Sequence, residues 1–259
     1  MNICINKWYG RLGNNIIQVK HALLLALYYD FNVILPNHPY FNSEYIIINP
    51  KITKYNSKIQ DTQSEFFCLI DKNLTSYYQP VFDVNLDTVY KIIKKIFTIK
   101  DVDVRPVNDL VIHIRGGDIF SNNPHPGYIS PPLSYYTNIL NNNHFDKIII
   151  ISEDTLNPCV NALLGLYPNI TYKKNTLSDD IRLLLQSSNV IFSVGTFVSS
   201  LLLLSSNIKN IYATNEINNT LDTCSHINIH KTDLSKYFKL MGPWKNTKEQ
   251  RHILLNYKL

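Results

Sequence analysis

The chain has 259 residues, of which 45% are hydrophobic and 17% are charged, a composition typical of ordinary globular proteins. This length is long for one domain and short for two, so one large domain and two small ones both fit. The formal net charge is only +5, and the lysines are spread through Asn-, Ile- and Tyr-rich sequence. We therefore expect no nucleic-acid-binding tract, although a locally positive cleft for an anionic ligand fits the composition.

Residues 1–6 enter a short apolar stretch without a basic segment before it, and nowhere do about 18 apolar residues follow one another. We therefore expect no secretory signal, no membrane span and a cytoplasmic location. The cysteines are far apart and form no C-x-x-C pair, which favours free thiols over a zinc site or a disulfide framework. They are Cys4, Cys68, Cys159 and Cys224.

The first part of the chain predicts a β-α-β unit. Its expected elements are a strand at residues 3–5, an unbroken apolar helix at 14–29 and a strand at 32–35. Residues 36–78 are rich in Tyr, Asn and Pro, which predicts loops and short strands, including one at 66–70. Apolar residues at helical spacing then predict a helix at 86–97.

From residue 109 onward the pattern alternates between strands and helices. The expected strands are residues 109–115, 147–151, 170–172, 190–193 and 210–212, and the expected helices are 131–140, 158–166, 178–186 and 196–204. This alternation predicts a parallel sheet covered by helices on both faces. A domain boundary is expected near residues 101–108, between domains at 1–105 and 106–259. A closing helix at 244–257 could pack back on the first domain.

Ligands of open parallel sheets bind at the carboxyl ends of the strands, and three candidate segments follow predicted strands. The first is the segment 10–15 (GRLGNN), whose glycines permit a tight turn before a helix start that presents free N–H groups. A purely structural β-α turn explains the same pattern. Another candidate, the last along the chain, is the segment 193–200 (SVGTFVSS). Its hydroxyls before a helix could bind phosphate or could simply cap the helix.

The second candidate segment is 113–118 (HIRGGD). The two-residue period of a strand places His113 and Arg115 on the same side, and two glycines then turn the chain toward Asp118. An arginine at this place can bind phosphate oxygens with two parallel hydrogen bonds and keeps its charge at any working pH. The alternative is an Arg115–Asp118 ion pair that only stabilises the turn.

Four segments in one order along residues 10–200 resemble motifs of the clan of inverting fucosyltransferases that includes the α-1,2-, α-1,6- and protein O-fucosyltransferases. Segment 10–15 resembles the N-terminal glycine-asparagine turn of the clan, and segment 113–118 resembles its His-x-Arg-Arg-Gly-Asp motif. Segment 150–154 (IISED) resembles its strand that ends in Ser-Asp-Asp. Asp180 and the segment 193–197 resemble its acidic residue that precedes an Asn-Ser-Thr-Phe-Ser turn. Gly116 stands where many members have a second arginine, and Val194 and Gly195 replace the Asn-Ser pair.

The resemblance implies two facing Rossmann-like domains of the GT-B type, with an acceptor-side domain at 1–105 and a nucleotide-sugar-binding domain at 106–259. It implies transfer of L-fucose from GDP-fucose to a glycan hydroxyl, with inversion and without a metal or another cofactor. By resemblance, Arg115 would hold the β-phosphate, and Ser193 and Thr196 would also bind phosphate. His113 and Asp180 would contact guanine and ribose. Asn14 would line the active site from the first domain. The other nucleotide-sugar-binding positions that match the motifs are Gly13, Asp118, Ser152 and Asp154.

A stiff, proline-rich loop at residues 123–132 follows the arginine segment. Within it, Tyr128 could bind the acceptor, and His125 could act as a base because the intrinsic pKa of histidine lies near neutrality. An ordered surface loop without a catalytic role is the alternative.

Two other functions remain open on the sequence alone. Asp101 and Asp103 form an Asp-x-Asp pair like the manganese site of metal-dependent sugar transferases, which could use a UDP- or GDP-linked sugar; a solvated linker explains the same charges. A non-catalytic protein that binds a nucleotide sugar or a glycan is also compatible, since the sequence shows no compulsory base.

Overall fold

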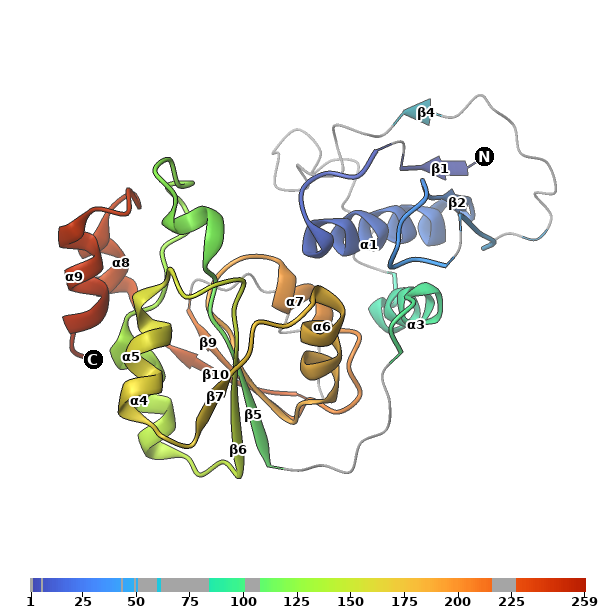
Figure 1. Ribbon diagram of the computed structural model, residues 1–259. Helices are drawn as coiled ribbons and strands as arrows, with labels where there is room; N and C mark the ends of the chain where they lie inside the picture. Colours follow the sequence, from blue (N-terminus) through green and yellow to red (C-terminus); the bar gives the residue numbers. More distant parts are fainter. Residues whose placement is uncertain are drawn as a thin grey trace. The chain divides into compact units, whose positions relative to one another are not determined.

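The computed structural model describes residues 2–5, 7–42, 44–48, 50, 60–61, 84–100, 108–215 and 227–259. The chain divides into two compact units, Met1–Lys100 and Asp101–Leu259, which we describe separately (Figure 1). Except for Asn108, the predicted boundary at 101–108 lies outside the described residues, as do Asp101, Asp103 and the strand predicted at 66–70.

The first unit begins with the predicted β-α-β arrangement. Strand β1 (Asn2–Cys4) pairs in parallel with β2 (Asn32–Ile34), and α1 (Leu12–Tyr29) connects them. The short strands β3 (Tyr45–Ile46) and β4 (Gln60–Asp61) complete a sheet of order β3-β2-β1-β4, in which only β3 is antiparallel to its neighbour. Helix α3 (Leu86–Ile96) packs against α1. Its amphipathic pattern buries Val89 and Ile93 completely.

The second unit is built on a parallel sheet of six strands within the described residues. The strands are β5 (Asp109–His113), β6 (Lys147–Ile151), β7 (Ile170–Tyr172), β8 (Asn189–Ile191), β9 (Asn210–Thr214) and β10 (Asn228–Thr232). Their order, β10-β9-β8-β5-β6-β7, is the order of the Rossmann fold when the strands are counted from β5. The predicted parallel sheet of this half is therefore confirmed.

Helices cover both faces of this sheet (Figure 1). Helices α4 (Leu133–Asn142) and α5 (Pro158–Leu166) lie on one face, and α6 (Leu177–Gln186) and α7 (Phe197–Leu202) lie on the other. The near-continuous apolar runs of the central strands suit this double burial, since a strand covered on both faces has no solvent side. Ile112, Ile150 and Ile191 are fully buried in the resulting core.

The C-terminal segment differs most from the sequence-based expectation. The closing helix α9 begins at Lys248 and ends at Asn256, and Trp244 precedes it in a loop. A capping box explains the late start, because Thr247 and Gln250 bond to each other's backbone N–H groups at the helix entrance. Helix α9 packs on α4 and α5 of its own unit. Strand β10 and helix α8 (Ser235–Met241) were not predicted, and the exposed, polar pattern of β10 explains why.

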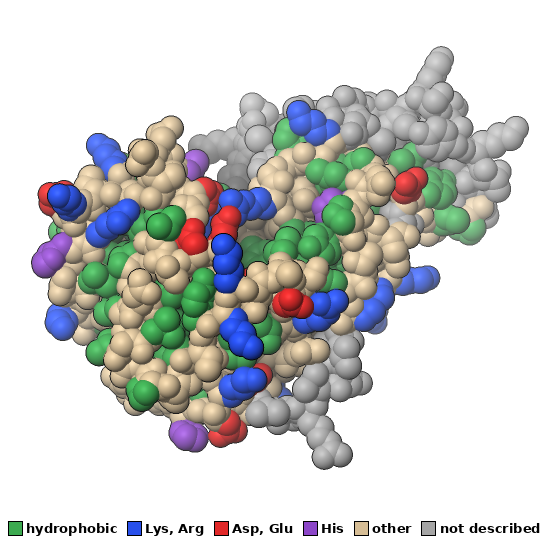
Figure 2. All heavy atoms as spheres, in the orientation of Figure 1, with side chains coloured by type: hydrophobic (Ala, Val, Ile, Leu, Met, Phe, Trp, Pro, Cys, Tyr) green, Lys and Arg blue, Asp and Glu red, His purple; other side chains and the backbone are tan. Residues whose placement is uncertain are grey.

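A 3-10 helix, η2 (Gly117–Phe120), also went unpredicted, directly after the arginine segment. None of the helices in the described parts of the chain combines the length and hydrophobicity needed to cross a bilayer. On the face shown in Figure 2, basic, acidic and hydrophobic side chains are intermixed with polar ones. This face agrees with the modest net charge.

Candidate functional site

The switch point of the second sheet lies between β5 and β8. From β5 the chain proceeds outward through β6 and β7, and it then crosses back to β8 and proceeds the other way through β9 and β10. The turns that follow β5 and β8 therefore lie at the same edge of the sheet, at the place where open α/β sheets bind ligands. The arginine segment follows β5, and the serine-rich segment 193–200 follows β8.

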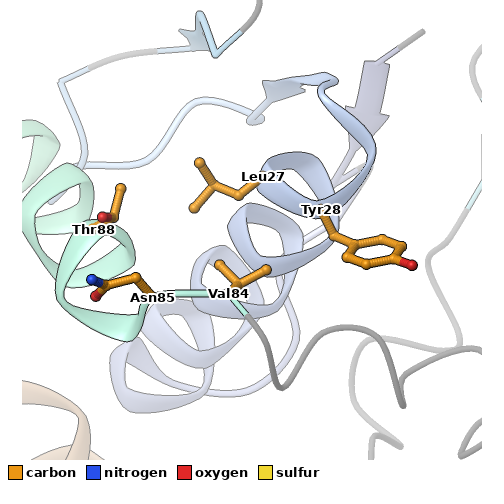
Figure 3. A pocket seen from close by; sticks show the side chains of 5 residues that line it. All are labelled: Leu27, Tyr28, Val84, Asn85 and Thr88. Carbon is orange, nitrogen blue, oxygen red and sulfur yellow. The ribbon is translucent and has the colours of Figure 1, made fainter.

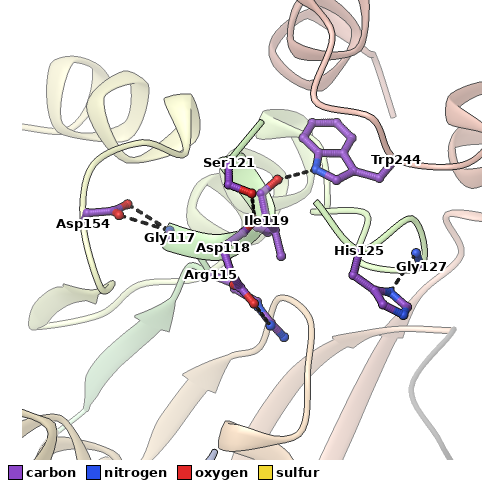
Figure 4. A network of polar contacts seen from close by, with 9 residues as sticks. All are labelled: Arg115, Gly117, Asp118, Ile119, Ser121, His125, Gly127, Asp154 and Trp244. Carbon is purple, nitrogen blue, oxygen red and sulfur yellow. Dashed lines mark hydrogen bonds and ion pairs between the residues drawn. The ribbon is translucent and has the colours of Figure 1, made fainter. Parts of the chain in front are cut away.

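Arg115 is held in a fixed orientation at this switch point. Its Nε and Nη2 atoms donate to the two carboxylate oxygens of Asp118 at 3.3 and 2.9 Å (Figure 4). Its guanidinium carbon lies 4.0 Å from the centre of the Tyr128 ring. The Arg115 side chain is 19% exposed and that of Asp118 is 46% exposed. An ion pair this exposed contributes at most about 1 kcal/mol, so it orients the guanidinium without sequestering it.

Gly195 gives the guanidinium its space. A Cβ atom at this position would lie 2.6 Å from Nη1 of Arg115, which is closer than such atoms approach in proteins. The backbone of Gly195 also has a φ of +102°, in a region that side chains other than glycine rarely adopt. Glycine at position 195, where the resembled motif has serine, therefore leaves the space that the Arg115 guanidinium occupies.

Ser193 and His113 form the floor beneath Arg115. The Ser193 hydroxyl accepts from the Arg115 backbone N–H at 3.2 Å and lies 3.4 Å from Nδ1 of His113. Both side chains are buried. Burial, and to a smaller extent the charge of Arg115, lowers the pKa of His113 to about 3. The imidazole is therefore neutral near pH 7, and Arg115 supplies the positive charge at this position.

Ser152 and Asp154 lie beside the same turn. The Asp154 carboxylate accepts from the Gly117 backbone N–H at 3.1 and 3.2 Å (Figure 4). Ser152 donates to the Asp154 carbonyl at 2.7 Å. A Cβ atom at Gly116 would collide with that carboxylate. The space of a second arginine side chain is thus taken by Asp154, which explains why glycine stands at Gly116.

Asp180 and Thr196 are the outer members of the predicted set. Asp180, in the first turn of α6, accepts from the Asn175 amide at 3.0 Å, and desolvation raises its pKa. Burial, followed by the negative charges of Asp154 and Asp180, raises the pKa of Tyr172 at the end of β7. Thr196 precedes α7, and its carbonyl accepts from the Ser199 hydroxyl at 3.2 Å.

The proline-rich loop brings Tyr128 and His125 to the edge of the site. Their ring centres lie 4.8 Å apart. His125 Nδ1 accepts from the Gly127 backbone N–H at 3.2 Å (Figure 4). His125 is exposed, whereas Tyr128 is half-buried against Arg115. Tyr128 therefore positions the arginine, and its contact with an acceptor stays a prediction.

Two supporting residues were missed by the sequence reasoning. Asn157, fully buried, donates to the Arg115 carbonyl at 3.1 Å and to Ser130 Oγ at 3.2 Å while it caps α5. Its place before a proline and an apolar helix was a visible capping signal. Trp244, 1% exposed, donates from Nε1 to the Ile119 carbonyl in η2 (Figure 4). No local pattern connects it to a turn 125 residues earlier.

The glycine-asparagine turn of the first unit is organised differently. Gly13 is buried within the first turn of α1, and Asn14 is half-buried with its amide against Gly10. Asn15, 4% exposed, donates to the Tyr9 carbonyl at 3.0 Å and lies 3.2 Å from Nε2 of His38. Desolvation lowers the pKa of His38. Asn15, which the sequence reasoning did not single out, is therefore the main polar anchor of this turn.

A separate hollow lies between α1 and α3 in the first unit (Figure 3). It is lined by Leu27, Tyr28, Val84, Asn85 and Thr88, and it contains none of the predicted site residues. Within the described residues, no three His, Cys, Asp or Glu side chains cluster as metal ligands would. Asp101 and Asp103 lie outside that part of the chain.

No protein-family model matches the sequence, and no curated protein matches it significantly. One solved structure that is similar to the chain is a NodZ α-1,6-fucosyltransferase from a crystal soaked with GDP-fucose. The two chains are 10% identical, and the superposition covers 78% of this chain and 92% of the other with a TM-score of 0.46.

Proposed function

We propose that this protein is a glycosyltransferase that binds the diphosphate of a nucleotide sugar at the switch point of its second sheet. The donor we propose is GDP-fucose, and the acceptor is a glycan hydroxyl that receives the sugar with inversion. The proposal rests on the motif resemblance of segments 10–15, 113–118, 150–154 and 193–197 and on the geometry of Arg115. It includes no metal or other cofactor.

The observation that carries the proposal is the orientation of the Arg115 guanidinium. Asp118 binds the Nε–Nη2 edge, Tyr128 covers one face, and Gly195 lies beneath Nη1. Among the described residues Nη1 makes no hydrogen bond, which leaves a donor for an oxyanion of the ligand. The glycine at position 195, with a φ of +102°, lets the turn after β8 approach the guanidinium this closely.

The proposed reaction needs positive charge where the diphosphate leaves. As the sugar–oxygen bond breaks, an oxocarbenium-like sugar forms and negative charge grows on the leaving phosphate, and Arg115 would stabilise that charge. Neutral His113 beneath it would keep Ser193 in place without adding a second cation. Groups aimed at developing charge typically contribute about 3–4 kcal/mol to the lowering of a barrier.

His125 is the candidate base for the acceptor hydroxyl within this proposal. It is exposed at the edge of the site. Its Nδ1 accepts from Gly127, so the neutral ring carries its hydrogen on Nε2, and Nδ1 would take the acceptor's proton after giving up the Gly127 contact. The His125→Ala enzyme is expected to lose the acidic limb of the pH–rate profile. An unchanged profile would remove His125 from the chemistry and leave deprotonation of the acceptor to another group.

A donor panel tests the proposal as a whole. We expect GDP and GDP-fucose to raise the melting temperature of the protein more than UDP and UDP-sugars do, and GDP-fucose to be hydrolysed slowly without acceptor. Activity is expected to survive EDTA, since Arg115 supplies the charge in this scheme. Binding without turnover on any acceptor would favour a binding protein instead, and loss of activity in EDTA would favour a metal site at Asp101 and Asp103.

A further inference from the structure

The second unit contains another hollow that shares no residue with the predicted site. It lies between the turn after η2 and the start of α9. Its lining residues are Ser121, Asn122, Lys245, Asn246, Lys248 and Arg251. The hollow is therefore formed by two segments more than a hundred residues apart in the sequence.

The lining of this hollow is strongly basic. Three of its six residues are cationic and none is acidic, in a chain whose whole formal charge is +5. Within the described residues, none of these three cations forms an ion pair with a carboxylate. The nearby acid Glu249 is used at the helix entrance, where hydrogen bonds from its own backbone N–H and from Thr247 lower its pKa. Cations gathered around one hollow repel each other, and an anion between them relieves that repulsion.

The hollow is also held rigidly. Asn246, with a φ of +57°, donates to the carbonyls of Phe120 and Ser121 at 2.8 and 3.0 Å, and its Oδ1 accepts from Arg251 Nε at 2.7 Å. The Arg251 guanidinium carbon lies 5.6 Å from the centre of the Phe120 ring. The bond to Asn246 uses only Nε, so the two Nη groups keep their hydrogen-bonding capacity for a ligand.

Gln250 fixes the backbone that carries the two lysines. Its buried side chain accepts from the Lys245 N–H at 2.8 Å and donates to the carbonyls of Met241 and Pro243 at 3.0 and 2.9 Å. The segment between α8 and α9 therefore presents its cations from an ordered loop. Less conformational entropy is lost when a rigid loop binds than when a mobile one does.

We propose that this hollow binds one tetrahedral oxyanion, a phosphate or sulfate group, at a site distinct from the one that contains Arg115. The guanidinium of Arg251 matches such a group geometrically, and Lys245 and Lys248 add point charges. Ser121, the residue after η2, donates its hydroxyl hydrogen to the Asp118 carbonyl at 2.7 Å, so the cations and not this hydroxyl would hold the anion. The source of the oxyanion is either the free ion or a phosphorylated or sulfated saccharide.

Titration calorimetry at constant ionic strength tests this site. The experiment uses the Arg115→Ala protein, so that inorganic phosphate cannot report on the nucleotide site. We expect saturable binding of phosphate or sulfate that weakens about tenfold or more in the further variant Lys245→Gln/Lys248→Gln, as expected when charge-assisted hydrogen bonds are lost. The matched control Lys236→Gln/Lys239→Gln removes two exposed lysines of α8 and should leave the affinity unchanged.

Further titrations distinguish the two sources of the oxyanion, and they distinguish this hollow from the site that contains Arg115. Tighter binding of a sulfated or phosphorylated disaccharide than of the free ion, with no binding of the neutral disaccharide, identifies a saccharide as the source; equal binding identifies the free ion. Equal weakening by both lysine pairs, or no saturable binding, overturns the proposal. In the protein that keeps Arg115, the Lys245→Gln/Lys248→Gln variant should bind GDP normally, so failure of this site does not depend on failure of the nucleotide site.

Discussion

The two units each contain a glycine turn at the carboxyl end of their first strand, and the two turns use their polar groups in opposite ways. After β1, the side chains of Asn15, Gln18 and His38 bond to one another or to backbone groups close by. After β5, Asp118, Tyr128 and Gly195 orient Arg115 and leave Nη1 without a hydrogen bond among the described residues. A closed network stabilises a fold, whereas an oriented and partly open charge is suited to a ligand.

The largest expected effect concerns the neutral histidine under Arg115. Burial lowers the pKa of His113 to about 3 in the folded protein. In the unfolded chain the same imidazole takes up a proton near pH 6.5, so between these two pH values the unfolded state binds more protons than the folded state. Stability from this group is complete above about pH 6.5 and falls as the pH drops, by up to about 1.4 kcal/mol per pH unit. Urea unfolding of wild type and His113→Gln from pH 7 to 4 measures the difference.

The variant is expected to lose less stability per pH unit than wild type over this range, because glutamine does not titrate. Parallel pH dependences would contradict the neutral, buried state of His113. They would also weaken the contrast between the two turns, since a charged imidazole would add a second cation beside Arg115.

The next effect concerns the closed turn of the first unit. Asn15→Ala leaves the partners of a buried amide unsatisfied and is expected to lower the free energy of unfolding by about 1–3 kcal/mol. The affinity for GDP should stay within a factor of two of wild type. Asn14→Ala, one residue away and half-buried, should cost less stability and reduce transfer to the acceptor. If instead Asn14→Ala loses the stability and Asn15→Ala loses the transfer activity, the side chain of Asn15 faces a substrate and the turn is not a closed network.

The smallest effect concerns the tyrosine that covers Arg115. A contact between a guanidinium and an aromatic face contributes about 0.5–2 kcal/mol, so Tyr128→Leu should weaken GDP binding about twofold to thirtyfold. Tyr128→Phe keeps the aromatic face and should bind GDP as wild type does. If both variants lose affinity equally, the hydroxyl and not the ring face is what matters.

Much of this architecture could be predicted from the sequence because its signals are local. The apolar strand at Lys147–Ile151 and the helix at Pro158–Leu166, with its Asn-Pro entrance, lie where the pattern placed them. The strand β10 could not be predicted, since an exposed edge strand has no hydrophobic alternation. The start of α9 was wrong because Trp244 continues the apolar pattern into a loop, where its indole is buried and bonded to Ile119.

The residue types of the site could be predicted from the sequence, but the residues that hold Arg115 in position could not. His113, Arg115, Asp118 and Ser193 come together because the strand order brings β5 next to β8. The support from Asn157 and the space left by Gly195 depend on contacts between segments far apart in the chain. Such contacts leave no local pattern, so neither residue could be connected with Arg115 from the sequence alone.

Calorimetric titration of GDP into wild type, Arg115→Lys and Arg115→Ala tests the central claim most directly. The account predicts that Arg115→Lys, which keeps the charge and loses the planar fork, binds GDP at least about tenfold more weakly than wild type, and that Arg115→Ala binds it more weakly still. Wild-type affinity for GDP in both variants, with the fold intact, would contradict it and would leave the Arg115–Asp118 pair as a purely structural feature of the turn.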